Sequence, residues 1–386
     1  MKRLWRLLKS LTRLRWRILP PRHKPVLLYF VTGADVIAPY FSSDEFQVLD
    51  LREHEVNLWV ALKCFFNRDL SAKNYALIFI EIVKPKLVIT FIDNYPPFFQ
   101  LKNRFPDIQT VFIQNGVRSE RGDLFGSSLE SLKLEGNHVD QMFVFGGAVG
   151  AIYSKYISGE IVPIGSFKNN LVPITKSKTR TVAYISTYRS GLARKIIIPD
   201  SLPGFPIEYG QIIDRREQTI IFLANFCKNN NLSLVIIGKD EDFAAEKSYY
   251  DKLLKDFSWT IAQRQTTTIN YEVVDESEIV VFTSSTLGYE SLARGKKTAA
   301  FLIDAEIIDS PSIKFGWPVS LSDDGKFWTN RLDEVRFEEI LNYLLASSCD
   351  DWEKVRAETM REIINFDPGN SQFVAMVQSL RADWSH

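Results

Sequence analysis

Short apolar runs rich in β-branched residues alternate with helical segments along this chain, and the alternation occurs in two separate stretches. In the first stretch the runs lie at 26–31, 87–92, 110–113 and 141–145, and helices are predicted at 55–66, 72–83, 96–104 and 147–157. Strands that are apolar throughout are buried on both faces, and strands separated by helices pair in parallel. The first stretch therefore predicts a parallel sheet covered by helices.

The second stretch begins after a polar segment and repeats the pattern. Its strands are predicted at 181–186, 232–237, 279–282 and 298–303. Helices are predicted between them at 214–228, 245–256 and 286–294, and three further helices near 334–346, 350–364 and 371–382 close the chain. At 386 residues the chain is long enough for two domains. We predict an α/β protein of two Rossmann-like domains, with domains at 25–168 and 179–348, a linker at 169–178 and C-terminal helices at 349–386.

The first 24 residues differ in charge from the rest. They hold nine of the 47 lysine and arginine residues and none of the 47 acidic ones, so the body of the protein is acidic. Leucines recur there at helical spacing and cations lie on another face. This pattern predicts an amphipathic helix within the segment 1–24, and Pro20 ends that helix. Such a helix fits an anionic membrane surface through residues 2–19 without spanning the bilayer. A helix docked on the protein's own surface is the alternative.

Composition excludes several classes of function. An acidic body does not favour nucleic acid as a partner. The three cysteines, Cys64, Cys227 and Cys349, are far apart and form no zinc or disulfide pattern, which favours a reducing compartment. Only four histidines are present, which argues against a histidine-rich metal site. The sequence therefore predicts a cytoplasmic protein, peripheral on the inner face of the cytoplasmic membrane, with no metal.

The segment at 278–297, EIVVFTSSTLGYESLARGKK, carries the strongest functional pattern. A strand runs into four hydroxyl residues at the start of a helix, and Glu290 follows one turn later. Hydroxyls and backbone N–H groups at a helix N-terminus form a natural phosphate site, although such residues also cap helices. The four predicted phosphate ligands are Thr283, Ser284, Ser285 and Thr286.

Two other loops follow predicted strands of the same sheet. Gly238 and Lys239 come after the strand at 232–237, and Arg189 comes after the strand at 181–186. In open parallel sheets, ligands bind beyond the carboxyl ends of the strands. We therefore expect these residues to converge with the hydroxyl cluster on one nucleotide site.

The motif TSSTLGYESLARGKK resembles the donor-binding strand–helix unit of GT-B glycosyltransferases, particularly those that build bacterial surface polysaccharides. This resemblance implies a cleft between the two domains, in which the hydroxyl cluster holds the donor phosphate and Glu290 holds the ribose. The Ser-Ser pair also resembles transferases that use CMP-activated acidic sugars. The donor is therefore a nucleotide sugar, used as a substrate rather than a cofactor, with CMP, UDP and GDP all open.

The N-terminal half supplies the acceptor side. Asp93 ends a predicted strand and could accept a proton from an acceptor hydroxyl, although an Asp-Asn turn that caps the next helix is equally compatible. Farther along, the loop FIQNGVR resembles the Gln–His/Asn–Gly–x–Arg loop of surface carbohydrate biosynthesis proteins and, more loosely, of polyol-phosphate polymerases. Asn115 stands where the polymerases carry histidine. Arg118 is placed to stabilise the leaving phosphate, and Glu120 and Asp123 are reserve bases; a solvated charged loop is the alternative.

Together these features and the resemblance predict a metal-independent, inverting glycosyltransferase with Asp93, Asn115 and Arg118 as catalytic residues. It would move a sugar to a surface-glycan or lipid-linked acceptor in bacterial surface polysaccharide biosynthesis. Two other enzymes of the same fold stay open, a CDP-polyol phosphotransferase and a nucleotide-sugar 2-epimerase. A non-enzymatic nucleotide-binding module is the third alternative.

Overall fold

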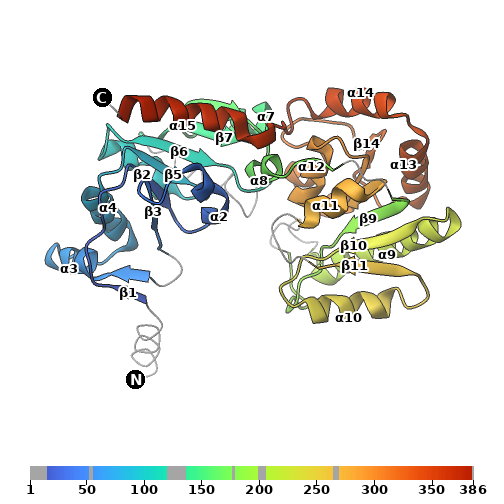
Figure 1. Cartoon of the computed structure of the whole chain (residues 1–386). Helices are drawn as coiled ribbons and strands as arrows, with labels where there is room; N and C mark the ends of the chain where they lie inside the picture. Colours follow the sequence, from blue (N-terminus) through green and yellow to red (C-terminus); the bar gives the residue numbers. More distant parts are fainter. Residues whose placement is uncertain are drawn as a thin grey trace, which may run out of the picture.

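The computed structural model describes residues 15–51, 55–119, 136–175, 179–198, 206–263 and 269–384, and it contains two parallel α/β domains (Figure 1). The N-terminal sheet has the strand order β3-β2-β5-β6-β7-β8, and all of its pairings are parallel. Its strands are β2 (Val26–Tyr29), β3 (Phe46–Leu49), β5 (Leu87–Thr90), β6 (Gln109–Ile113), β7 (His138–Val144) and β8 (Ser158–Pro163).

Side-chain caps start two helices of this domain, and the others begin without one. Asn57 caps α3 by accepting from the backbone N–H groups of Trp59 and Val60, and Ser71 caps α4. These helices are α2 (Ala34–Ile37), α3 (Leu58–Phe66), α4 (Ala72–Val83), α5 (Pro96–Phe99) and α7 (Gly147–Tyr153). Helix α4 has the predicted bounds, whereas the predicted helix at 55–66 starts with strand β4 (Glu55–Asn57).

The C-terminal sheet has the order β11-β10-β9-β12-β13-β15-β14, and only β14 runs antiparallel. Its strands are β9 (Thr181–Ile185), β10 (Ser233–Ile237), β11 (Trp259–Ala262), β12 (Ile279–Phe282), β13 (Thr298–Phe301), β14 (Asp324–Gly325) and β15 (Trp328–Thr329). Its helices are α9 (Tyr209–Asn229), α10 (Phe243–Leu253), α11 (Ile269–Glu276), α12 (Thr286–Ala293), α13 (Glu334–Ala346) and α14 (Cys349–Met360). The predicted fold class is confirmed.

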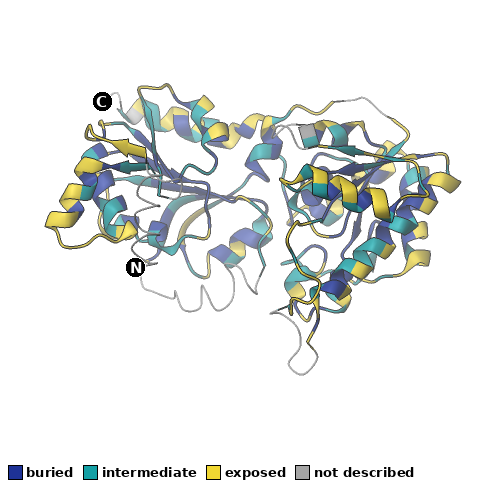
Figure 2. Cartoon of the chain, turned by 90° about the horizontal axis from the view of Figure 1, so that it is seen from below, coloured by how far each residue is buried: buried dark blue, intermediate teal, exposed yellow. Residues whose placement is uncertain are grey.

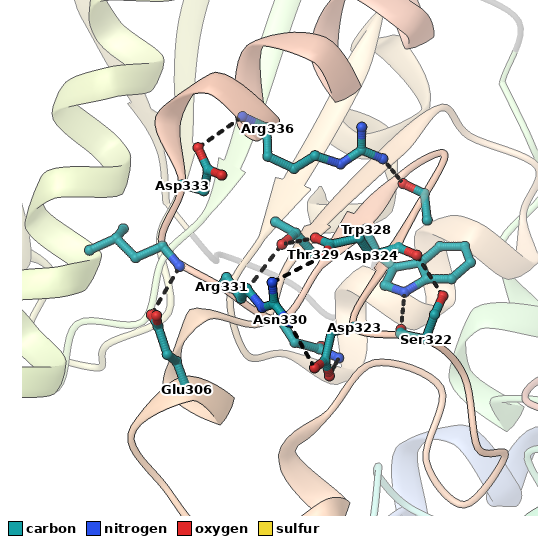
Figure 3. A network of polar contacts seen from close by, with 12 residues as sticks. Glu306, Ser322, Asp323, Asp324, Trp328, Thr329, Asn330, Arg331, Asp333 and Arg336 are labelled. Atoms are coloured by element: carbon teal, nitrogen blue, oxygen red, sulfur yellow. Dashed lines mark hydrogen bonds and ion pairs between the residues drawn. The ribbon is translucent and has the colours of Figure 1, made fainter.

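Polar contacts close the β14–β15 edge of this sheet (Figure 3). The Thr329 hydroxyl donates to Asp324 at 2.7 Å, the Trp328 indole N–H donates to the Ser322 carbonyl at 3.0 Å, and Arg336 donates to the Gly325 carbonyl at 2.6 Å. An edge strand exposes unpaired backbone groups, and here side chains satisfy several of them.

The C-terminal helices, predicted as one segment at 349–386, divide between the two domains. The Trp352 indole of α14 donates to the Gly295 carbonyl of the second domain at 2.8 Å. Helix α15 (Ser371–Trp384) crosses back over the N-terminal sheet (Figure 1), where Phe373 and Val377 enter its core and Arg381 pairs with Glu45. The last helix therefore belongs to the first domain in space.

The predicted linker begins with a buried helix. Helix α8 (Phe167–Leu171) lies between the two domains (Figure 1), and Asn169 in it is fully buried. Arg294, at the end of α12, pairs with Asp275 and donates to the carbonyls of Asn169, Val172 and Pro173. The side chains of Arg294 and Asp275 are 0% and 1% exposed, so this ion pair anchors the linker to the second domain.

The N-terminal prediction is only partly covered by the structure. Residues 1–14 lie outside the described residues. At 15–17 the predicted helix is wrong: strand β1 (Arg15–Arg17) pairs in parallel with β4, and the chain beyond it is extended rather than helical. Among the described residues, no helix is long and apolar enough to cross a bilayer.

We predict that Arg294→Ala lowers the free energy of unfolding by about 3–5 kcal/mol, because it leaves the Asp275 carboxylate buried without its counter-ion. Urea denaturation followed by tryptophan fluorescence measures the loss. Arg331→Ala is the matched control, since Arg331 is 57% exposed beside Asp323 and an exposed pair contributes about 1 kcal/mol or less. Equal losses in the two variants would contradict the anchoring role of Arg294.

Candidate functional site

Three central strands of the C-terminal sheet end at the same edge. Strand β9 lies between β10 and β12 and pairs in parallel with both. The carboxyl ends of the three strands and the loops beyond them therefore lie together. Glu246, on α10, is fully buried at this edge. Its carboxylate accepts from the Ser186 hydroxyl after β9 and from the backbone N–H groups of Lys239 and Asp240 after β10. One carboxylate therefore sets the shape of two loops.

Gly238 allows the β10 loop to close in this way. A Cβ atom at this position would lie 3.1 Å from the Glu246 carboxylate and 3.2 Å from the Ala262 carbonyl. A side chain would therefore displace the loop that carries Lys239. Lys239 itself is exposed at the pocket described below.

The four predicted phosphate ligands have four different environments. Thr283 is 1% exposed, and Ser284 is exposed away from the pocket. Ser285 caps α12 by accepting from the Leu287 N–H at 3.2 Å, and the Thr286 hydroxyl accepts from the Val117 N–H of the first domain at 3.2 Å. Direct contact with a phosphate is thus contradicted for Thr283, which is inside the core, whereas Ser285 and Thr286 line the pocket.

The loop after β6 brings the first domain against this helix end. The Gln114 side chain shapes the loop, because it donates to the Gly116 carbonyl at 2.9 Å and accepts from the Phe145 N–H at 2.8 Å. Asn115 is exposed at its tip. A Cβ atom at Gly116 would lie 3.4 Å from the Thr286 hydroxyl, so a larger residue would crowd the contact.

These elements enclose a pocket of about 280 Å³ between the domains. Six of the predicted residues line it: Asn115, Gly238, Lys239, Ser285, Thr286 and Glu290. Lys168, Asn270 and Tyr271 also line it and were not predicted. Lys168 is the last residue of the predicted first domain, next to the predicted linker, and the neutral Asn270 and Tyr271 begin a helix that the sequence analysis missed, so no pattern distinguished them.

Glu290 is the carboxylate among the lining residues, and it is buried. It accepts from the Ser166 hydroxyl at 2.5 Å, and the Tyr271 hydroxyl also donates to it. Burial raises the pKa of Glu290 above its ordinary value, although Ser166, Tyr271, Lys168 and Arg294 oppose the shift. Glu290 therefore both lines the pocket and joins the domains.

Asp93 is placed differently from the prediction. It is fully buried, and its carboxylate accepts from the guanidinium of Arg118, with the Nε contact at 2.7 Å, and from the Tyr153 hydroxyl. In this structure the Asp93 carboxylate is enclosed and orients Arg118, so it is not placed to meet an acceptor sugar. Its role as general base stays a prediction.

Arg118 lines a narrow crevice next to the main pocket, together with Val117, Tyr289 and Trp317. Its side chain is 14% exposed. The reserve bases Glu120 and Asp123 lie outside the described residues. Among the described residues, no group of three or more histidine, cysteine or acidic residues could hold a metal ion.

Arg189 does not converge with the other predicted residues. It is exposed and lines a separate pocket of about 220 Å³ with Tyr188, Arg194 and Tyr249. The loop after β9 lines this pocket together with α9 and α10, and Ser190 in it donates to the Asp240 carboxylate of the β10 loop. Arg189 therefore lies outside the pocket that contains Lys239, and its role in donor binding stays a prediction.

Comparisons with known proteins agree with this architecture. A family model described as "putative O-antigen biosynthesis protein" matches residues 111–381. No curated protein matches the chain in sequence. Among solved structures, the chain is similar to a variant of the wall teichoic acid polymerase TagF, with 9% identity, a TM-score of 0.52, and coverage of 96% of this chain and 91% of that chain.

Two further structures are similar in fold. Sucrose-phosphate synthase from Thermosynechococcus elongatus has 12% identity and a TM-score of 0.50, with coverage of 94% of this chain and 100% of that chain. TarM of S. aureus, solved with UDP, has 14% identity and a TM-score of 0.44. The match covers 75% of this chain and only 55% of TarM. At these identities the likeness to TagF and to the sucrose-phosphate synthase concerns the fold, which is the GT-B arrangement of two Rossmann-like domains.

We predict that Asp93→Asn destabilises the protein by about 3–5 kcal/mol, because it leaves the Arg118 guanidinium without its buried counter-ion. In the double variant with Arg118→Met, part of this loss should be recovered, since the uncompensated charge is then gone. Chemical denaturation of the single and double variants measures the coupling. Wild-type stability in Asp93→Asn would contradict the structural role given to Asp93.

A second prediction concerns pH. Because the pKa of Glu290 is raised in the folded state, the folded protein holds this proton more tightly than the unfolded chain. Wild-type stability therefore falls as the pH rises from the unfolded-state pKa through the folded-state pKa. Glu290→Gln removes this decline, so its stability relative to wild type should grow by about 1.4 kcal/mol for each unit by which the pKa is raised.

Urea denaturation of both proteins between about pH 4 and pH 8 measures this difference. Glu272→Gln, at an exposed position of α11, controls for the loss of any carboxylate. A difference between Glu290→Gln and wild type that does not change with pH would contradict the predicted pKa.

Proposed function

Since the chain belongs to this O-antigen biosynthesis protein family, we propose that it is a glycosyltransferase that moves a sugar from a nucleotide-activated donor to a surface-glycan or lipid-linked acceptor. The observation that carries the proposal is the pocket between the domains, which combines Lys239, the N-terminus of α12 and Glu290 with Asn115 of the other domain. A pocket at the carboxyl ends of parallel strands is the usual ligand position in such sheets.

The donor phosphates bind between Lys239 and the start of α12. The positive end of the helix dipole and the lysine ammonium both favour an anion there. Ser285 and Thr286 contribute through the helix end that they form. Lys239 stabilises the negative charge that develops on the leaving phosphate, so that departure requires no metal and no cofactor.

Glu290 binds the ribose of the donor. Its carboxylate accepts from Ser166 and Tyr271, and a carboxylate has about four acceptor positions, so capacity remains for sugar hydroxyls. The nucleotide would then contact the residue that also joins the domains. CMP, UDP and GDP all fit this chemistry.

The acceptor approaches from the first domain, past Asn115 and Arg118. Direct displacement with inversion requires a base for the acceptor hydroxyl, and Asp93, the predicted base, is enclosed in this structure. The reaction takes place on the cytoplasmic side, with residues 2–19 holding the enzyme at the inner face of the membrane, close to a lipid-linked acceptor.

We predict that Lys239→Ala weakens binding of the tightest nucleotide among UDP, GDP, CMP and CDP by about tenfold or more, because it removes a charge-assisted contact to phosphate. Isothermal titration calorimetry measures the affinities. Arg189→Ala is the matched control, since it removes a cation from the same sheet edge outside this pocket, and its affinity should stay within about twofold of wild type.

The outcomes separate the alternatives. No heat from any nucleotide with folded wild-type protein would contradict the proposal and favour a non-enzymatic module. A larger loss of nucleotide affinity in Arg189→Ala than in Lys239→Ala would indicate that the phosphates bind in the pocket that contains Arg189. Turnover of a CDP-polyol, with every nucleotide sugar left intact, would favour the phosphotransferase.

A further inference from the structure

Helix α3 presents an apolar face to solvent. Trp59, Phe65 and Phe66 are 50%, 63% and 76% exposed, and Leu58 and Leu62 on the same face are also exposed. At 100° per residue these five side chains cover an arc of about 120°. Only Val60 and Cys64 of this helix are buried, so its outer face is the more apolar one. Soluble monomers rarely expose apolar side chains contiguously, and such surfaces mark interaction sites.

The apolar face continues onto the segment before it. Asn57, which caps α3, also donates to the Leu19 carbonyl at 2.7 Å and so holds that segment beside the helix. Trp16, Ile18 and Leu19 in the segment are exposed as well. Strand β1 pairs with β4, which runs directly into α3. Two stretches of the chain therefore contribute to one surface, which we call the α3 face (Trp16, Ile18, Leu19, Leu58, Trp59, Leu62, Phe65 and Phe66).

The charges around the α3 face are mainly positive. Arg15, Lys63 and Arg68 are exposed beside it. Two acids border it: Glu55 pairs with Arg17, and Asp69, which keeps its negative charge, accepts from the Ser71 N–H at 2.9 Å. The sequence of α3 itself contains no acid, and residues 1–24 of the sequence hold nine cations and no acid.

We propose that the α3 face docks on an anionic lipid surface. Aromatic and leucine side chains enter the acyl boundary of such a surface while flanking cations contact its headgroups. The face lies at the end of the N-terminal domain remote from the second domain (Figure 1), and its exposed residues are visible on α3 in Figure 2. It therefore leaves the interdomain pocket accessible.

Charge argues for lipid rather than for a second copy of the chain. A contact between two α3 faces would bring the cations of one copy close to those of the other. An anionic membrane would instead neutralise them and remove the aromatic side chains from water. The inference does not depend on the nucleotide pocket, but it extends the membrane attachment proposed for residues 2–19, with which the α3 face shares Trp16, Ile18 and Leu19.

The test uses the full chain and co-sedimentation with vesicles of phosphatidylcholine and phosphatidylglycerol. Phe65→Asp combined with Phe66→Asp should reduce the partition coefficient by about tenfold or more, because two exposed aromatic side chains are lost and two negative charges are added. Val335→Asp is the matched control, since Val335 is 70% exposed on the other domain, and its partitioning should equal that of wild type.

Further measurements make the result decisive. Circular dichroism and thermal melting establish that both variants fold, and nucleotide affinity should be unchanged in both. If the wild-type protein partitioned equally to pure phosphatidylcholine vesicles and to the mixed vesicles that contain phosphatidylglycerol, the role of the cations would be contradicted. Unchanged partition of the double variant, or a change from dimer to monomer in light scattering without a change in partition, would overturn the proposal.

Discussion

The arrangement of the two domains depends on the buried ion pair between Arg294 and Asp275. Both side chains are removed from water, and a buried guanidinium is tolerable only when its donors are satisfied. Asp275 and the carbonyls of the chain after α8 supply these acceptors. The connection between the domains is therefore fixed to α12 rather than left as a loose tether. This attachment places Ser166 and Lys168 beside Glu290 and so completes the pocket.

Glu290 links the pocket to the domain junction. Its carboxylate is buried, has a raised pKa and receives hydrogen bonds from both sides of the junction, through Ser166 and Tyr271. Burying a carboxylate costs free energy, and neutral hydroxyl donors offset that cost only in part. A ligand hydroxyl that donates to the same group would supply a further hydrogen bond. Under the proposed function, nucleotide binding and the relative position of the domains would be coupled through this residue.

The first domain contributes two features to the site: a backbone N–H group, that of Val117, and a cation, Arg118, whose position is fixed by a carboxylate. Gln114 shapes the loop that brings the Val117 N–H to Thr286, and Asp93 fixes Arg118 at the neighbouring crevice. The carboxylate expected to perform proton transfer serves in this structure as a buried counter-ion.

The sequence by itself determined the two parallel α/β domains, because strands buried on both faces must be apolar throughout, as in β5 and β12. It missed β3 and β11, whose half-buried residues lack that continuous pattern. It also predicted that Lys239, Ser285 and Glu290 converge at the carboxyl edge of one sheet, and they do line one pocket. Only the tertiary structure decided which way each loop turns: Arg189 leaves the site, Thr283 enters the core and Asp93 is enclosed by Arg118 and Tyr153. The strand order fixes where a loop starts, whereas burial and hydrogen-bond partners from distant segments fix where its side chains point.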